Sequence, residues 1–415
     1  MGKLKFTRKE ISWILYDVGN SAFVMLVATI LPIYFNSMAG NAGISEVNAM
    51  AYWGYAVSVS TILVALTGPV LGAMADRKGL KKPLFLTCVA MGVLACGSLW
   101  LPSSWFLFLC LFVIAKVGYN TSLIFYDAML VDVTEPERLD VVSSNGYAWG
   151  YIGSCVPFIA SLVLVLCYKQ LGISIGTAMC AAFILNALWW LFMTLPLLKT
   201  YEQKWYVEQK GNMLRESLTR LWKTLAEMRS QKQIFLYLLS FFFFIDGVYT
   251  IIEMATAYGS ALGLDSSGLL LALLVTQIVA FPCALVFSGL SAKYETGSLL
   301  KVCIAAYIGI ILFAIQLDKQ WEFWLLAVLV GMFQGGIQAL ARSYFAKIIP
   351  AEKSGEYFGI YDICGKGASF MGTMLTGLVA QITGHANAGV AAIAVLFVIG
   401  FILFSKVDGM QKKAA

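Results

Sequence analysis

Long apolar stretches recur along the whole chain, and their length limits what it can fold into. A helix needs about 20 apolar residues to cross the hydrocarbon core of a bilayer, and 60% of the 415 residues are hydrophobic whereas 13% are charged. Continuous apolar runs such as 241–245 and 269–275 differ from the alternating pattern of a membrane-spanning barrel. The sequence therefore predicts an all-α membrane protein with about twelve transmembrane helices. The expected spans are 11–38, 48–74, 82–101, 104–131, 144–169, 174–198, 233–262, 267–291, 297–317, 321–345, 356–383 and 387–406.

The start of the sequence and its cysteines indicate a retained first helix and no cofactor. The first ten residues are basic and polar, and the apolar stretch behind them is too long for a secretory signal and lacks a small-residue cleavage site. The nine cysteines fall inside expected spans without metal-ligand spacing, so we interpret them as packing residues. Neither a nucleotide-binding loop ending in Gly-Lys-Ser or Gly-Lys-Thr nor an HExxH motif is present, so we expect no enzyme, no cofactor and no metal.

Lysine and arginine residues gather on alternate connections between the expected spans. By the positive-inside rule these connections are cytoplasmic, which places both termini and the central loop 199–232 on that side and makes the number of spans even. We expect a monomeric, multi-pass protein of the cell's inner (plasma) membrane, and its net charge of +6 needs no nucleic-acid partner. Outside the central loop, the basic residues that mark these connections are Lys3, Lys5, Arg8, Lys9, Arg77, Lys78, Lys81, Lys82, Lys293, Lys301, Lys347, Lys353, Lys412 and Lys413, whereas the opposite connections carry little beyond Lys169 and Lys319.

Six expected spans, a polar connection and six more spans indicate a duplicated architecture. We divide the chain into an N-terminal bundle (1–198), a linker (199–232) and a C-terminal bundle (233–415). Segments 126–138 and 342–353 support the duplication, because both run from the fourth helix of their half into a loop with a proline, a glutamate and a basic residue. In carriers, such repeats place the substrate site at the midplane between the halves.

Part of the linker has apolar residues at helical spacing, with lysine and arginine elsewhere around the helix. This pattern at 209–232 predicts an amphipathic helix that lies on the inner leaflet or beneath the bundle. A simple tether between the two halves is the alternative.

A glycine-rich loop stands between the second and third spans, GPVLGAMADRKGLKK at 68–82. Its glycines allow helices to approach closely, and Asp76 can pair with basic residues or cap the N-terminus of a neighbouring helix. The loop resembles the signature loop of the major facilitator superfamily. This resemblance implies a fold of two pseudo-symmetric six-helix bundles that Asp76 and Arg77 help to latch on the cytoplasmic side. The corresponding loop of the second half, 289–297, has Lys293 where the acid of a second latch would fall.

Four further segments carry a closer resemblance: WILYDVGNSAF at 13–23, DGVYTI at 246–251, QGGIQALARSYF at 334–345 and EYFGIYDICGK at 356–366. Together they are similar to the vacuole-effluxer family of the superfamily, whose fungal members export amino acids from the vacuole. The resemblance implies a transporter of an amino acid or a similar solute. It departs at Gly372 and Thr373, where Gly-Pro is expected.

Ionisable residues at bilayer depth are costly and are therefore candidates for function. Counted at 1.5 Å per residue, Lys116 on the fourth span and Asp246 on the seventh both lie roughly 16 Å inside the membrane, so we expect them to meet as an ion pair. Helical spacing places polar stripes on the first, fourth, seventh and tenth spans, and the resemblance implies that these helices line a central cavity. The candidate substrate-binding residues are Lys116, Asp246, Asn20, Tyr119, Asn120, Tyr249, Glu253, Gln334, Gln338 and Lys366. The candidate gating or coupling residues are Asp17, Asp76, Arg77, Asp127, Arg342 and Asp362.

Several interpretations of these residues compete. Lys116 with Asp246, and Asp127 with Arg342, can instead be structural ion pairs that hold helices together. The favoured function is a secondary transporter that moves a small polar or zwitterionic solute by alternating access, with protons as a candidate coupling ion because buried acids can be neutralised. One alternative is an exporter of amphiphiles or drugs with the run 241–244 in its pocket, and another is a non-transporting receptor or scaffold. The expected partners are a small-molecule substrate and the lipid bilayer.

Overall fold

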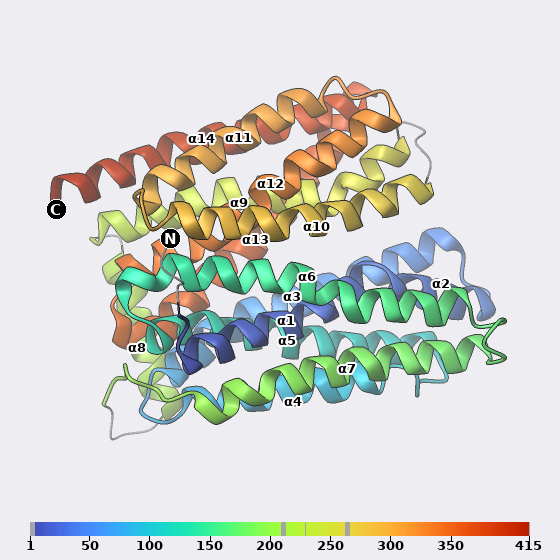
Figure 1. Ribbon diagram of the computed structural model, residues 1–415, viewed down its shortest axis with the longest axis horizontal. Coiled ribbons are helices and arrows are strands. Elements are labelled where there is room, and N and C mark those ends of the chain that lie inside the picture. The colour runs from blue at the N-terminus through green and yellow to red at the C-terminus, as the bar shows by residue number, and fades with distance from the viewer. Residues whose placement is uncertain (1–4, 209–212, 229, 262–265, 415) are drawn as a thin grey trace.

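The computed structural model describes residues 5–208, 213–228, 230–261 and 266–414. These residues fold into helices, and their one strand-like feature is an isolated bridge between Arg77 and Val207. The prediction of an all-α protein is therefore confirmed. The helices of the first half form one layer and those of the second half another, with the spanning helices roughly along one direction (Figure 1).

The first half contains α1 (Arg8–Ala28), α2 (Ile30–Asn41), α3 (Glu46–Ala75), α4 (Lys81–Gly97), α5 (Trp105–Val133), α6 (Leu139–Leu166) and α7 (Ile175–Thr200). The second half contains α9 (Lys232–Ala261), α10 (Ser266–Leu290), α11 (Thr296–Ala314), α12 (Gln320–Ile348), α13 (Ser354–Thr383) and α14 (Ala386–Ala414). Helices α1 and α2 together correspond to the first expected span. Among the described residues, 10 segments are long and apolar enough to cross a membrane, and α4 has only 17 residues.

The two segments that suggested a duplication have the same local structure in both halves. After α5 the chain makes the short 3-10 helix η1 (Pro136–Arg138) before α6, and after α12 it makes η2 (Ala351–Lys353) before α13. Pro136 is the first residue of η1, where its fixed backbone angle suits a helix, and Pro350 is the N-cap residue of η2. This repeated corner brings the end of α5 and the end of α12 to the same end of the molecule.

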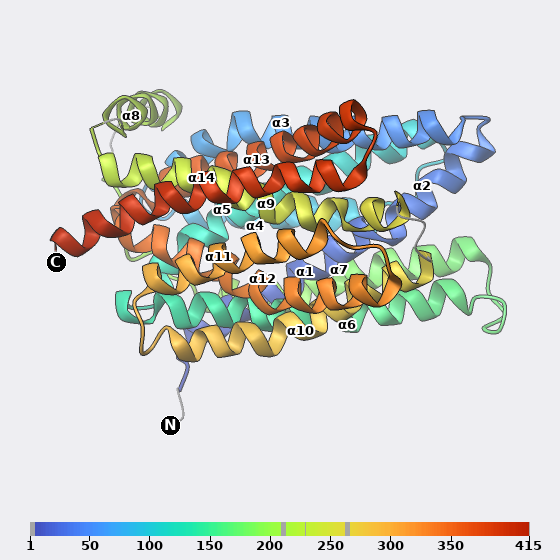
Figure 2. The same cartoon turned by 90° about the horizontal axis from the view of Figure 1, so that it is seen from above.

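Helix α8 (Met213–Met228) forms within the linker, as its amphipathic pattern predicts. It lies across the end of the bundle, and it is seen end-on where the spanning helices are seen from the side (Figure 2). Leu221 and Met228 are buried, whereas Trp222 and Leu225 are exposed. Both ends of the chain lie at this same end of the molecule (Figure 1), which we call the terminal end.

Candidate functional site

The polar contacts that cross between the halves lie between the terminal end and the middle of the helices. On the first half they come from α1, the end of α3, the start of α4, the second half of α5 and the first half of α6. On the second half they come from the end of α10, the start of α11, the second half of α12 and the first half of α13. We call the contacts nearest the terminal end the terminal gate. Its first-half members are Asp17, Asp76, Lys81, Asp127 and Asp140, and its second-half members are Thr296, Arg342, Lys347, Ser354 and the first turn of α13.

Asp76 joins the end of α3 to the start of α13 in the other half. Its carboxylate accepts the backbone amides of Gly355 over 2.7 Å and Glu356 over 2.9 Å. Those amides have no partner within α13, and a negative charge is favourable at a helix N-terminus. Gly72 permits the approach, because a Cβ atom there would lie 2.1 Å from the carbonyl oxygen of Gly355. Burial raises the pKa of Asp76 to about 7, while nearby Lys81, the two amides and Arg220 act against that rise.

Arg77, the other residue expected in this latch, lies on the linker side of the loop. Its backbone pairs with Val207, and the amide of Val207 donates to the carbonyl oxygen of Asp76 over 2.7 Å. Gln203 adds two contacts, donating to the Ala75 carbonyl and accepting the amide of Gly79, both over 3.0 Å. The segment after α7 therefore crosses the signature loop as a strap, which we define as residues 201–207.

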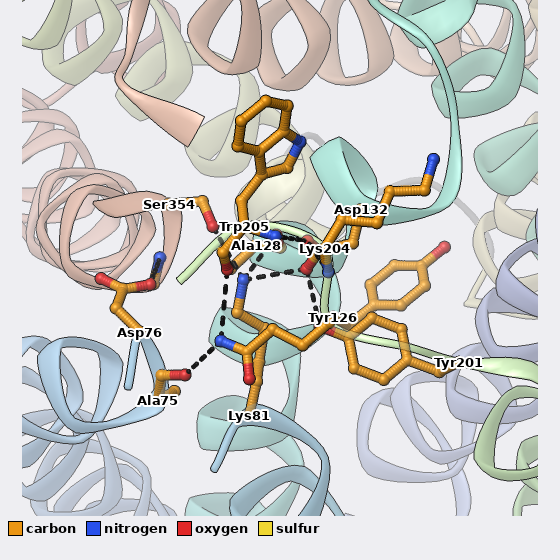
Figure 3. A network of polar contacts seen from close by, with 12 residues as sticks. Ala75, Asp76, Lys81, Tyr126, Ala128, Asp132, Tyr201, Lys204, Trp205 and Ser354 are labelled. Atoms are coloured by element: carbon orange, nitrogen blue, oxygen red, sulfur yellow. Dashed lines mark hydrogen bonds and ion pairs between the residues drawn. The ribbon is translucent and has the colours of Figure 1, made fainter. Parts of the chain in front are cut away.

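The carboxylate of Asp132 lies at the centre of a buried network beside this strap (Figure 3). Lys81 and Asp132 are fully buried, and their Nζ and Oδ2 atoms lie 3.0 Å apart. Lys81 also reaches the second half, where its Nζ donates to the hydroxyl of Ser354 over 2.9 Å. A buried ion pair needs its remaining hydrogen-bonding positions filled, and the strap fills them. The further donors to Asp132 are the Tyr201 hydroxyl (2.6 Å) and the amides of Lys204 (3.0 Å) and Trp205 (2.9 Å).

The second-half corner of the gate also contains an acid, although it does not come from the expected position in its own loop. Lys293, which stands where the acid was sought, is exposed. The acid is supplied instead by Asp140 in the first turn of α6: its Oδ2 lies 2.6 Å from the Nζ of Lys347 and accepts the hydroxyl of Thr296 over 2.6 Å. In the first-half corner the ion pair, Lys81 with Asp132, lies within one half. In the second-half corner the ion pair, Lys347 with Asp140, joins the two halves. The sequence of the second-half loop could not reveal that its acid comes from the other half.

Arg342 of α12 crosses into the first half and lies between two acids. Its Nη1 donates to Asp127 over 3.0 Å, and its Nη2 lies 3.7 Å from Asp17. The expected pairing of Asp127 with Arg342 is therefore present, and Asp17 shares it. The arginine is 2% exposed, and a buried charge is stable only when it is paired and hydrogen-bonded, as it is here. Further partners are Ser143, through its hydroxyl and carbonyl, and the rings of Trp13, Tyr126 and Tyr147 at 4.6, 5.4 and 4.3 Å.

The expected ion pair between Lys116 and Asp246 is not formed. Asp246 is fully buried and accepts the amide of Gly372 over 2.8 Å and the hydroxyl of Thr250 over 3.3 Å. The approach requires a glycine, because a Cβ atom on Gly372 would lie 2.3 Å from the Asp246 carboxylate. Lys116 and Asp246 were expected at the same depth in the membrane, but the carboxylate of Asp246 turns toward α13 of its own half instead of toward Lys116.

Lys116 has charged neighbours other than Asp246. Its electrostatic neighbours are Glu253 of α9, which is exposed, and Lys366 of α13. Lys366 pairs with Asp362 and donates to the carbonyl oxygen of Asn120 over 3.4 Å, so it crosses between the halves one turn from Lys116. The middle of the molecule thus places Lys116, Glu253 and the pair of Lys366 with Asp362 within electrostatic range of one another, on three helices of both halves.

The other candidates lie at different places in the middle region. Gln338 accepts the hydroxyl of Tyr151 over 2.9 Å across the halves, and Gln334 is buried next to it on α12. Tyr249 is half-buried, with its ring near Gly365. Two residues instead lie inside the packing of the first half. Asn20 donates to the carbonyl of Tyr16, and the ring of Tyr119 contacts those of Phe23 and Trp190.

Two other features of the sequence have structural explanations. Residues 172–176 match the GxSxG pattern of hydrolase nucleophiles, but Ser174 is the exposed N-cap of α7 and accepts the amide of Thr177 over 3.1 Å. The run 241–244, considered as an apolar pocket, contributes Phe241 and Phe244 to the buried core of the second half. In the described part of the chain, no group of three His, Cys, Asp or Glu residues could hold a metal.

The arrangement of two helical bundles, joined at one end by a signature-loop carboxylate that caps a helix of the opposite bundle, defines a transporter of the major facilitator type. A family model described as "Vacuole effluxer Atg22 like" matches residues 7–137 and 131–415. The chain belongs to this Atg22-like family of multi-pass membrane transporters.

Relatives and solved structures agree with this assignment. The chain is 40% identical over 406 residues to the "Uncharacterized MFS-type transporter YxiO" of Bacillus subtilis (strain 168), covering 97% of this chain and 95% of that protein. It is 22% identical over 449 residues to "Autophagy-related protein 22" of Coccidioides immitis (strain RS), covering 88% and 73%. In fold it is similar to the transporter FucP in the outward conformation, with a TM-score of 0.72, 13% identity and coverage of 96% and 98%.

Proposed function

We propose that the protein is a secondary transporter that moves a small zwitterionic solute, such as an amino acid, by alternating access. The observation that carries the proposal is the group of Lys116, Glu253 and Lys366, which comes from both halves and lies on the inner side of the terminal gate. A solute with a carboxylate and an ammonium group complements such a group, the carboxylate at the lysines and the ammonium at Glu253. The name of the family, a vacuole effluxer, favours export of such a solute.

The proposal is tested by transport into liposomes that contain the purified protein. We expect uptake of one or more radiolabelled amino acids, and a loss of that uptake with Lys116→Met or Glu253→Gln. Uptake of amphiphilic compounds alone would favour a drug exporter, and binding without flux would favour a receptor. Phe241 and Phe244 lie in the core, so the pocket of a drug exporter would need other apolar residues of the second half, such as Met254 and Phe281.

We also propose Asp246 as the proton-binding residue. Its carboxylate is fully buried and accepts hydrogen bonds from Gly372 and Thr250, which are neutral donors. A buried carboxylate whose partners are neutral is favoured in its protonated form. Asp246→Asn is expected to mimic that form, so its uptake should no longer respond to a pH gradient across the liposome. Asp318→Asn, an exposed carboxylate of the same half, is the control and should respond as the wild type does.

The orientation is a third element of the proposal: the terminal end faces the cytoplasm of the cell that carries this chain in its plasma membrane. The basic residues near that end support it through the positive-inside rule. A reporter fused after the C-terminus is expected to report a cytoplasmic location. A reporter inserted at Gly172, in the exposed loop before α7, is expected to report an external location. The reverse result at either site would contradict the orientation. With this orientation, a closed terminal gate corresponds to an outward-facing state.

A further inference from the structure

One arginine of the linker lies between acids of the two halves. The Nε of Arg220 on α8 donates to Glu356 Oε2 over 2.8 Å, and its Nη2 lies 3.7 Å from Asp76 Oδ2. The same group donates to the carbonyl oxygen of Ala73 at the end of α3. The arginine side chain is 9% exposed, and both carboxylate side chains are fully buried. A single guanidinium thus contacts the last turn of α3 and the first turn of α13.

The two carboxylates at this position need a cation between them, and Arg220 supplies it. Asp76 and Glu356 belong to opposite halves, and two buried carboxylates so close together repel each other without a cation. Lys81 acts on Asp76, but its ammonium is already bonded to Asp132 and Ser354. Oε1 of Glu356 has no hydrogen-bond partner among the described atoms, and among the described residues Arg220 is the one cation that pairs with this carboxylate. Removing the guanidinium would convert an attraction between the halves into a repulsion.

The course of the linker fixes the place of this arginine. The strap at 201–207 is bonded to the signature loop and to Asp132, which anchors the start of the linker on the first half. Helix α8 then runs across the terminal end and packs on α3 and α9 (Figure 2). Its Arg220 therefore reaches the junction of the halves from outside both bundles. An ordinary tether would need neither the strap nor the buried charge.

We infer that α8 is a moving part of the terminal gate, and that Arg220 is the positioning residue that holds the two halves closed through Asp76 and Glu356. The inference rests on the proposed alternating-access function, because it states what must change when the terminal end opens. To separate the start of α13 from the end of α3, α8 has to release Glu356. The linker thereby controls the access of the middle site to the terminal end.

Hydrogen–deuterium exchange of the purified full-length protein tests this without knowledge of the substrate. In Arg220→Gln, amides at 72–77 and 354–358 are expected to exchange about tenfold or more faster than in the wild type, since a hydrogen bond to a charged group contributes at least that factor. The control is Lys223→Gln on the same helix, whose side chain is 73% exposed and pairs within α8 with Glu227. It should exchange as the wild type does. Wild-type exchange at both segments in Arg220→Gln would overturn the inference.

A second variant separates a gate residue from a mere anchor of α8. In the double variant Arg220→Gln with Glu356→Gln, the repulsion is removed, so exchange at 354–358 should return most of the way to the wild-type rate while α8 stays faster. If the arginine only anchors α8, the second substitution changes nothing at 354–358, and the inference fails. Should Arg220→Gln not fold, Glu356→Gln alone decides: faster exchange at 72–77, in the opposite half, supports the inference, and unchanged exchange there overturns it. Because exchange requires no flux, a failed transport assay would leave this result intact.

Discussion

Arg342→Gln is expected to abolish transport and to open the terminal gate. The arginine lies between Asp17 and Asp127 with 2% of its surface exposed, so its loss leaves one buried and one half-buried acid without their cation. Removing one partner of a buried charge network costs about 3–5 kcal/mol, and here that cost falls on the closed state, which is the one that makes the contacts. The helices themselves should persist, because the acids can hydrate or take up protons once the gate opens.

The measurement is flux in liposomes, together with hydrogen–deuterium exchange at 139–147, which should become faster. Arg342→Lys should recover little, because lysine keeps the charge but lacks the planar fork that contacts two acids, a hydroxyl and aromatic rings together. Asp127→Asn combined with Arg342→Gln should recover part of the closed state, since one of the two unpaired charges is gone. Full transport by Arg342→Gln would contradict a gating role and leave the arginine without a function in the cycle.

The arrangement of the spans was predictable because it depends on a local property. The length and polarity of each stretch determine whether it can cross a bilayer, whatever the rest of the chain does. The break between α1 and α2 was missed, although Pro32 gives a signal for it: a proline in the first turn of α2 cannot accommodate the carbonyl of the residue four positions earlier, so a continuous helix is disfavoured there.

The candidate site was predictable only in part. Counting residues along a helix gives the depth of Lys116 and Asp246, but contact also needs the rotation of each helix, which packing determines. Asp246 turns to the amide of Gly372, next to Thr373, where a proline is expected. The missing proline is no signal for this contact, because the amide of Gly372 is a donor whichever residue follows it.

The number of charged residues near the terminal end predicts orientation but does not predict which charges pair. Lys81 and Lys347 were counted as topology signals, yet the first is fully buried with Asp132 and the second pairs with Asp140 across the halves. Asp132, Asp140 and Arg220 received no role at all, because each is paired with a residue far away in the sequence. A net count of lysine and arginine gives orientation, whereas the pairing of individual charges depends on which helix ends meet.

Asp132→Asn is expected to cause the largest loss of stability in the first half. Its carboxylate accepts four contacts, from Lys81, Tyr201 and two backbone amides of the strap, and no water can replace them at 0% exposure (Figure 3). An asparagine can still accept at one atom, but its amide group faces the donors at the other, so Lys81 is left as a buried charge without a counter-ion. The cost of such a broken pair is about 3–5 kcal/mol. Thermal unfolding of the purified protein should show a lowered Tm, with early proteolysis within the strap at 201–207.

Glu135→Gln is the matched control, because Glu135 is a nearby acid that pairs with Lys204 while 70% exposed, and its loss should change stability by no more than about 0.5 kcal/mol. Replacing the whole pair, with Lys81→Met and Asp132→Leu, should recover only part of the loss, since apolar side chains remove the two charges but leave the amides of Lys204 and Trp205 without their acceptor. A Tm for Asp132→Asn equal to that of Glu135→Gln would show that the strap is held by other contacts, and would remove the anchor from which α8 reaches the gate.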